Sequence, residues 1–141
     1  MIRVLTTFFG YVLITLNFCA AQSNNWSDKS EWTLYDTKGA KFYNIKVDTL
    51  HQLPHCKLDN DTMKSFLNQA TVLPSNKIPA WMGAYVVSYT YQHKTRKIDI
   101  STYSGFFYDE SLQTFFQIDA EKQKRWHDYL ALNMNALLSS Q

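Results

Sequence analysis

The chain has few of the residues that cross-link a protein or interrupt its secondary structure. Its 141 residues include two cysteines, three prolines and four glycines. So little glycine and proline excludes collagen-like and low-complexity sequence, and two cysteines cannot build the disulfide framework of a small secreted scaffold. An excess of one charge is also missing, because 14 basic and 12 acidic residues leave a net charge of +2. This balance argues against a nucleic-acid-binding protein.

The first 21 residues predict a secretory signal peptide. Arg3 gives a basic start, an apolar run covers residues 4–18, and residues 19–21 (Cys-Ala-Ala) offer small side chains for cleavage before Gln22. The run is shorter than the roughly 20 residues that span a bilayer, so we expect removal rather than retention as an anchor. Bulky Phe18 before the cysteine favours ordinary cleavage over lipid attachment. We therefore expect a periplasmic or secreted protein that does not contact the membrane after cleavage.

The mature chain is predicted to hold a flexible polar leader, residues 22–30, and a single domain, residues 31–141. Its length fits one domain, and a hydrophobic content of 45% excludes a disordered chain. Alternating apolar and polar residues predict about five strands within residues 31–35, 42–47, 84–91, 98–103, 106–108 and 114–118. In the second of these, Tyr43, Ile45 and Val47 are expected to face the core, and residues 92–97 are expected to form a polar, basic connection.

Two helices complete the predicted domain. Apolar residues at helical spacing predict a short helix over residues 63–70, capped by Asp59 or Asp61. A longer helix is expected after Asp119, with an apolar face running from residue 126 to residue 138. The fold class is therefore α+β: an antiparallel sheet of about five strands, with the short helix and the long C-terminal helix packed on one face.

Candidate catalytic and metal-binding residues are sparse. His51, His55 and Cys56 form the densest group of metal-ligating side chains, but Pro54 interrupts a helix there and no second group completes a site. Cys56 could act as a nucleophile with a histidine as base, although no local motif of a cysteine enzyme surrounds it. A glycine-rich phosphate loop and a nucleophile elbow are both absent. We predict no metal, no cofactor and no enzymatic activity, with cysteine or histidine chemistry as the least favoured hypothesis.

The aromatic content points to binding. Aromatic residues make up 16% of the chain, and many of them fall on both faces of the predicted sheet. These are Tyr85, Tyr89, Tyr91, Tyr103, Phe106, Phe107, Tyr108, Phe115 and Phe116. One core layer does not need so many rings, so the sheet is expected either to present rings to a partner or to curl around a cavity.

A short segment, Ser104-Gly105-Phe106-Phe107-Tyr108, joins two predicted strands. If Gly105 adopts a positive φ, it turns the chain outward and presents the Ser104 and Tyr108 hydroxyls together. The segment resembles the Ser-Gly-x-x-Tyr loop of bacterial periplasmic lysozyme inhibitors. In that family the loop enters the lysozyme cleft, and the resemblance implies that Ser104 and Tyr108 meet the catalytic carboxylates while Gly105 shapes the loop.

Together these features predict an exported protein-binding module, an inhibitor or immunity protein that blocks a secreted hydrolase or toxin, with lysozyme as a specific target. The predicted partner-binding residues are Trp81, Tyr103, Ser104, Gly105 and Tyr108, since tyrosine and tryptophan commonly anchor interfaces. The alternative is an extracytoplasmic carrier that holds a small molecule in an aromatic cavity between the sheet and the C-terminal helix.

Overall fold

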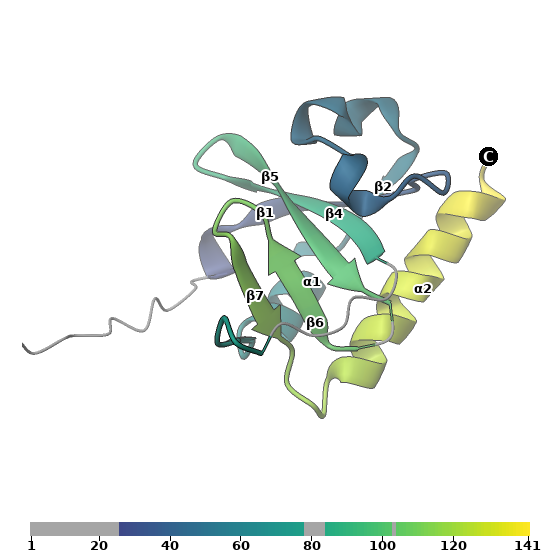
Figure 1. The fold of residues 1–141 in the computed structure, drawn as a ribbon. Coiled ribbons are helices and arrows are strands. Elements are labelled where there is room, and N and C mark those ends of the chain that lie inside the picture. Colours follow the sequence, from purple (N-terminus) through teal and green to yellow (C-terminus); the bar gives the residue numbers. More distant parts are fainter. Residues whose placement is uncertain (1–25, 78–83, 103) are drawn as a thin grey trace, which may run out of the picture.

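Figure 1 shows the computed structural model, which describes residues 26–77, 84–102 and 104–141. Seven antiparallel strands form one sheet in the order β2-β1-β4-β5-β6-β7-β3. The strands are β1 (Ser30–Tyr35), β2 (His55–Lys57), β3 (Thr71–Val72), β4 (Ala84–Tyr91), β5 (Lys94–Ser101), β6 (Phe106–Asp109) and β7 (Thr114–Gln117). The helices are α1 (Asn60–Leu67) and α2 (Gln123–Ser139), with the 3-10 helices η1 (Trp26–Asp28), η2 (Phe42–Asn44) and η3 (Val47–Gln52). The α+β class is confirmed, with seven strands in place of about five. The predicted signal peptide lies outside the described residues.

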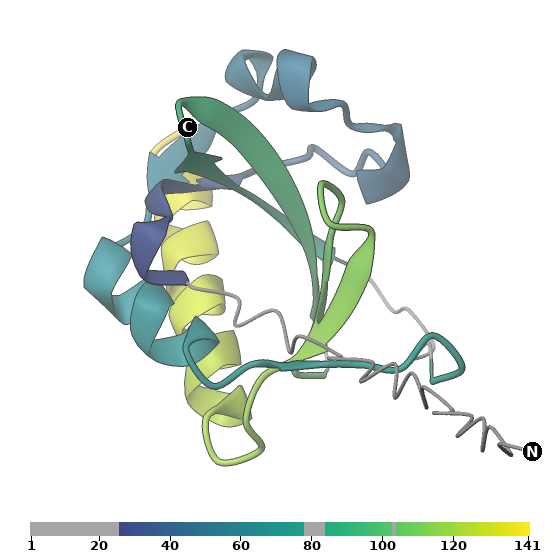
Figure 2. The same ribbon diagram turned by 90° about the vertical axis from the view of Figure 1, so that its left-hand side faces the viewer.

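The sheet curls, and both α-helices lie on its concave side (Figure 2). Asp59 caps α1 by accepting a hydrogen bond from the Thr62 amide, as predicted. The concave face is filled by a cluster of buried rings and aliphatic side chains that includes Trp26, Trp32, Tyr89, Phe107, Phe116 and Trp126. Ring centroids within this cluster lie between 5.0 and 6.1 Å apart. In the described part of the chain, no helix combines the length and hydrophobicity needed to cross a bilayer.

The opposite, convex face is covered by the segment that contains η2 and η3, drawn in blue in Figure 1. A smaller apolar cluster joins this segment to the sheet through Tyr35, Ile45, Leu50 and Val86. Beside it lies Lys97 of β5, whose side chain is fully buried. Its ammonium group donates hydrogen bonds to the carbonyl oxygens of residues 42 and 45, at 2.9 and 2.8 Å. The cover of the convex face is therefore attached by polar contacts as well as by apolar packing.

The predicted strand over residues 42–47 is wrong. Residues 42–44 form η2, and the Ile45 amide bonds back to the Phe42 carbonyl at 3.1 Å rather than to a neighbouring strand. The carbonyl groups of Phe42 and Ile45 accept hydrogen bonds from the Lys97 ammonium group, so they do not pair with a neighbouring strand. Ile45 is buried as predicted, whereas the Tyr43 side chain is 61% exposed.

Two predicted boundaries also shift. The flexible leader was expected to reach residue 30, but Trp26 is 1% exposed and belongs to the concave core, so residues 26–30 are part of the folded domain. The predicted connection over residues 92–97 is a turn at Gln92 and His93, both at positive φ, and β5 already begins at Lys94. Positive φ at both central residues is the geometry that the tightest β-hairpins require.

Candidate partner-binding site

Tyr108, one of the predicted partner-binding residues, is held in the hairpin formed by β6 and β7. The turn of this hairpin is fixed by Asp109, which is fully buried and accepts hydrogen bonds from the amides of Ser111 and Leu112 at 2.9 and 3.1 Å. The resulting register pairs Tyr108 with Phe115 across the two strands, with their ring centroids 4.6 Å apart. The pair lies on the convex face, because the alternate residues Phe107 and Phe116 point into the concave core.

A groove of about 420 Å³ opens beside this pair of rings. We call it the Tyr108 groove, and its lining residues are Val72, Leu73, Pro74, Ser75, Tyr108, Gln113, Thr114 and Phe115. No lining residue carries a charge. The groove therefore offers two aromatic rings, apolar side chains, and neutral hydroxyl and amide groups.

The hydroxyl group of Tyr108 is available to a partner. Among the described residues none forms a hydrogen bond with it, although the residue is half-buried. Burial and the neighbouring Glu110 and Asp99 carboxylates raise the pKa of the phenol, so it stays protonated at neutral pH. Tyr108 thus combines a large apolar contact area with a hydrogen-bond donor, a combination common at protein interfaces.

The other residues of the predicted loop are placed differently. Gly105 has no positive φ and is buried, so the prediction that it turns the chain outward is wrong. A Cβ atom at this position would lie 2.6 Å from Cγ of Gln123, so the side chain of this first residue of α2 occupies the space beside Gly105. The Ser104 hydroxyl donates to Ser101 Oγ at 2.9 Å. The segment that resembles the inhibitor loop continues directly into β6 within the sheet.

Tyr103 and Trp81 lie outside the described residues. Conversely, the sequence interpretation missed Phe115, Leu73 and Pro74 as parts of the site with Tyr108. The pairing of Phe115 with Tyr108 follows from the turn at residues 109–113, since a carboxylate there sets the hairpin register. Leu73 and Pro74 reach the groove because β3 adds to the free side of β7, a pairing with no local sequence signal.

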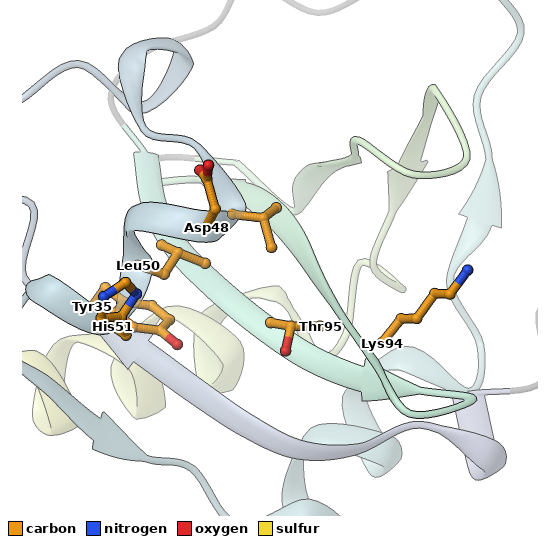
Figure 3. Close-up of a pocket in the computed structure, with 7 residues that line it drawn as sticks. Tyr35, Asp48, Leu50, His51, Lys94 and Thr95 are labelled. Carbon is orange, nitrogen blue, oxygen red and sulfur yellow. The ribbon is translucent and has the colours of Figure 1, made fainter.

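A second groove, of about 700 Å³, lies between η3 and the β4–β5 hairpin. Figure 3 shows Asp48, Leu50 and His51 on one side and Thr95 and Lys94 on the other, with Tyr35 among the lining residues. Its lining mixes an acid, bases, hydroxyls and apolar groups, so it selects no single ligand chemistry. The Tyr35 hydroxyl is already engaged with Ser88 Oγ at 3.0 Å.

The structure separates the residues considered for metal or nucleophilic chemistry. His55 and Cys56 are consecutive in β2, so their side chains leave opposite faces of the sheet. Cys56 lies against α2, with Sγ 3.9 Å from the Asn133 carbonyl oxygen, and burial raises the pKa of its thiol. Within residues 26–77, 84–102 and 104–141, no three histidine, cysteine or acidic side chains are placed to share an ion.

No protein-family model, curated protein sequence or solved structure matches this chain. The function must therefore be argued from the geometry of the chain itself.

Proposed function

We propose that this protein is an exported protein-binding module, and that the Tyr108 groove is its contact surface. The observation that carries the proposal is the Tyr108–Phe115 ring pair, half-buried at an open, uncharged groove, with a phenol hydroxyl to which no described residue hydrogen-bonds. Aromatic residues set in such pockets dominate the binding energy of many protein interfaces. The rings that a carrier would need for a cavity instead pack against one another on the concave face, which favours protein binding over the carrier alternative.

The partner in this proposal is a secreted hydrolase or toxin, which the module blocks as an inhibitor or immunity protein. The predicted signal peptide and the separation of the candidate catalytic residues support a blocking role over a catalytic one. Lysozyme is the first target to test, because the Ser-Gly-x-x-Tyr segment resembles the inhibitor loop. In the present geometry Tyr108, rather than Ser104, supplies the accessible hydroxyl for such a contact.

The lysozyme version is tested by following the clearing of a bacterial cell-wall suspension by several lysozymes, with the protein in excess. We expect inhibition by the wild-type protein, loss of inhibition for Tyr108→Ala, and full inhibition for Arg125→Ala. Arg125 is a suitable control because it is exposed on α2, on the other side of the sheet. Full lysozyme activity in the presence of the wild-type protein would overturn this version.

The wider proposal is tested with the same three proteins as baits for secreted proteins after chemical cross-linking. A stoichiometric partner should be captured by the wild type and by Arg125→Ala, and capture should fall at least tenfold for Tyr108→Ala. Equal capture by all three baits would show that the Tyr108 groove is not the contact surface.

A further inference from the structure

The two edges of the sheet are protected to different degrees. At one edge, β2 presents His55 and Lys57, both exposed, directly after Pro54. Charged side chains and proline at an edge discourage pairing with another strand. At the other edge, β3 presents Thr71 and Val72, which are exposed and uncharged, and the Val72 side chain is 52% exposed. Unlike β2, β3 therefore carries no charged side chain, and its protection is limited to its two-residue length and the nearby Pro74.

The hydrogen bonds of β3 leave one residue free to pair. The Leu73 amide donates to the Phe115 carbonyl at 2.9 Å, and the register pairs Thr71 with Gln117. In an antiparallel ladder the backbone groups of alternate residues point to opposite sides. The N–H and C=O groups of Val72 must then point away from β7, where no described residue pairs with them.

The Tyr108 groove on the convex face reaches this edge, because Val72 of β3 lines it together with Leu73 and Pro74, which follow β3 in the chain. A strand added beside β3 would lie about 4.8 Å from it and would direct every second side chain toward this face. An acidic side chain there would lose hydration beside the Glu110 and Asp99 carboxylates, and a basic one would find no charged partner among the lining residues. The chemistry of the site therefore favours uncharged, apolar side chains.

We propose that the β3 edge is a strand-addition site, which takes an extended, uncharged segment of the partner protein and seats an apolar side chain of that segment in the Tyr108 groove. This inference rests on the proposed function and names the chemistry of the partner. A second copy of the chain is a poorer occupant. Two copies meeting through strands of two residues each would bury far less than the roughly 1,200 Å² of a stable interface, whereas a flexible segment can follow the edge into the groove.

The test uses a phage-displayed library of random seven-residue peptides, selected on the wild-type protein. We expect the enriched peptides to be uncharged, with apolar residues at alternate positions. One labelled peptide from the selection is then used in fluorescence anisotropy measurements. Enrichment of acidic or basic peptides, or of none, would overturn the inference.

Matched proline variants test the edge itself. Val72→Pro removes an outward N–H without breaking the ladder to β7, a position at which a strand tolerates proline. We expect it to weaken peptide binding at least tenfold. Lys57→Pro removes an outward N–H at the β2 edge, because the adjacent Leu58 amide is the one bonded to β1, and it should leave affinity unchanged. Equal loss, or no loss, in both variants would overturn strand addition.

Amide hydrogen exchange of the wild-type protein gives a readout that needs no variant. Peptide binding should slow exchange of the Val72 amide, and unchanged exchange would contradict the proposal. If the protein without peptide is a dimer with a protected Val72 amide, and Val72→Pro is a monomer, then the occupant is a second copy and the proposal is wrong. If Tyr108→Ala abolishes partner capture while Val72→Pro does not, the proposed function stands and strand addition alone fails.

Discussion

The two faces of the sheet are covered in different ways. The concave face is sealed by rings and aliphatic side chains from the sheet, η1, α1 and α2. The convex face buries a cation, Lys97, which lies 3.4 Å from Asp99 Oδ1 and 2.6 Å from Glu110 Oε1 and also holds two carbonyl groups of the covering segment. Substitutions on the concave face should lower stability according to the side-chain volume they remove. Substitutions on the convex face should lower it according to the charges they leave without a partner.

This difference has a physical basis. Packing energy accumulates over many weak contacts and has little dependence on pH. A buried ion pair gains its stability only while each charge keeps its partner, and the loss of one partner leaves the other stranded in a poorly solvating environment. The two faces should therefore respond to different perturbations.

The largest effect is expected on the concave face, from Trp126→Ala. Trp126 is fully buried and its ring lies 5.3 Å from that of Phe66, so α2 would lose one of its ring contacts with α1. We expect a loss of about 3–5 kcal/mol in the free energy of unfolding, as for other large aromatic truncations. Urea denaturation checks this, and the loss should be similar at pH 5 and pH 8. A loss below about 1 kcal/mol would show that α2 contributes little to the core.

On the convex face, Lys97→Met should cost about 3 kcal/mol, because it leaves Asp99 without its cation and removes the donor to two buried carbonyl groups. The double variant Lys97→Met, Asp99→Asn should recover part of this loss, since no buried charge is then stranded. Urea denaturation of the single and double variants measures the coupling. Strict additivity of the two substitutions would contradict a charge-paired face.

The buried Asp99 carboxyl group should make the stability of the protein depend on pH. Burial, the main cause, raises the pKa of Asp99 from 3.8 to about 7, against the opposing effect of Lys97. Between pH 4 and pH 7 the folded protein therefore holds a proton that the unfolded chain releases, so this residue makes stability fall as the pH rises through that window. Chemical denaturation at several pH values should show a smaller fall for Asp99→Asn. If Asp99→Asn and the wild type showed the same pH dependence of stability, the titration would not belong to Asp99.

The smallest effect is expected where volume is added. Gly105→Ala places a methyl group within 3 Å of the Gln123 side chain, which can move because it is flexible. We expect a loss of about 1 kcal/mol, with most of it recovered in the double variant Gly105→Ala, Gln123→Ala. Thermal unfolding checks both variants. No recovery in the double variant would mean that backbone strain, rather than the clash, sets the cost.

The concave face was more accessible to sequence reasoning than the convex face. The strand Ala84–Tyr91 is predicted with its correct ends, because alternation against a continuous core leaves a clear pattern. The stripe of α2 was also expected, including Trp126 and Leu130, which are both buried.

The contacts that cover the convex face could not be predicted, because they are polar and join residues that are distant in sequence. Lys97 was read as part of a solvated hairpin connection, since lysine is rarely buried, and nothing local indicates that it reaches residues 42 and 45. The same limit applies to the candidate site. The local motif predicts Tyr108 as a site residue, whereas Leu73 and Pro74 come to it only through the pairing of β3 with β7.

The burial of Trp26 determines where this polypeptide can be shortened. Its indole contacts the rings of Trp32, Tyr89, Phe107 and Phe116, and the ammonium group of Lys29 lies 4.0 Å from its ring centroid. A recombinant fragment that starts at or just before residue 26 keeps this buried side chain. A fragment that starts at residue 31 lacks it, which leaves a cavity the size of an indole among four aromatic rings. Expression vectors and affinity tags for this protein should therefore retain Trp26.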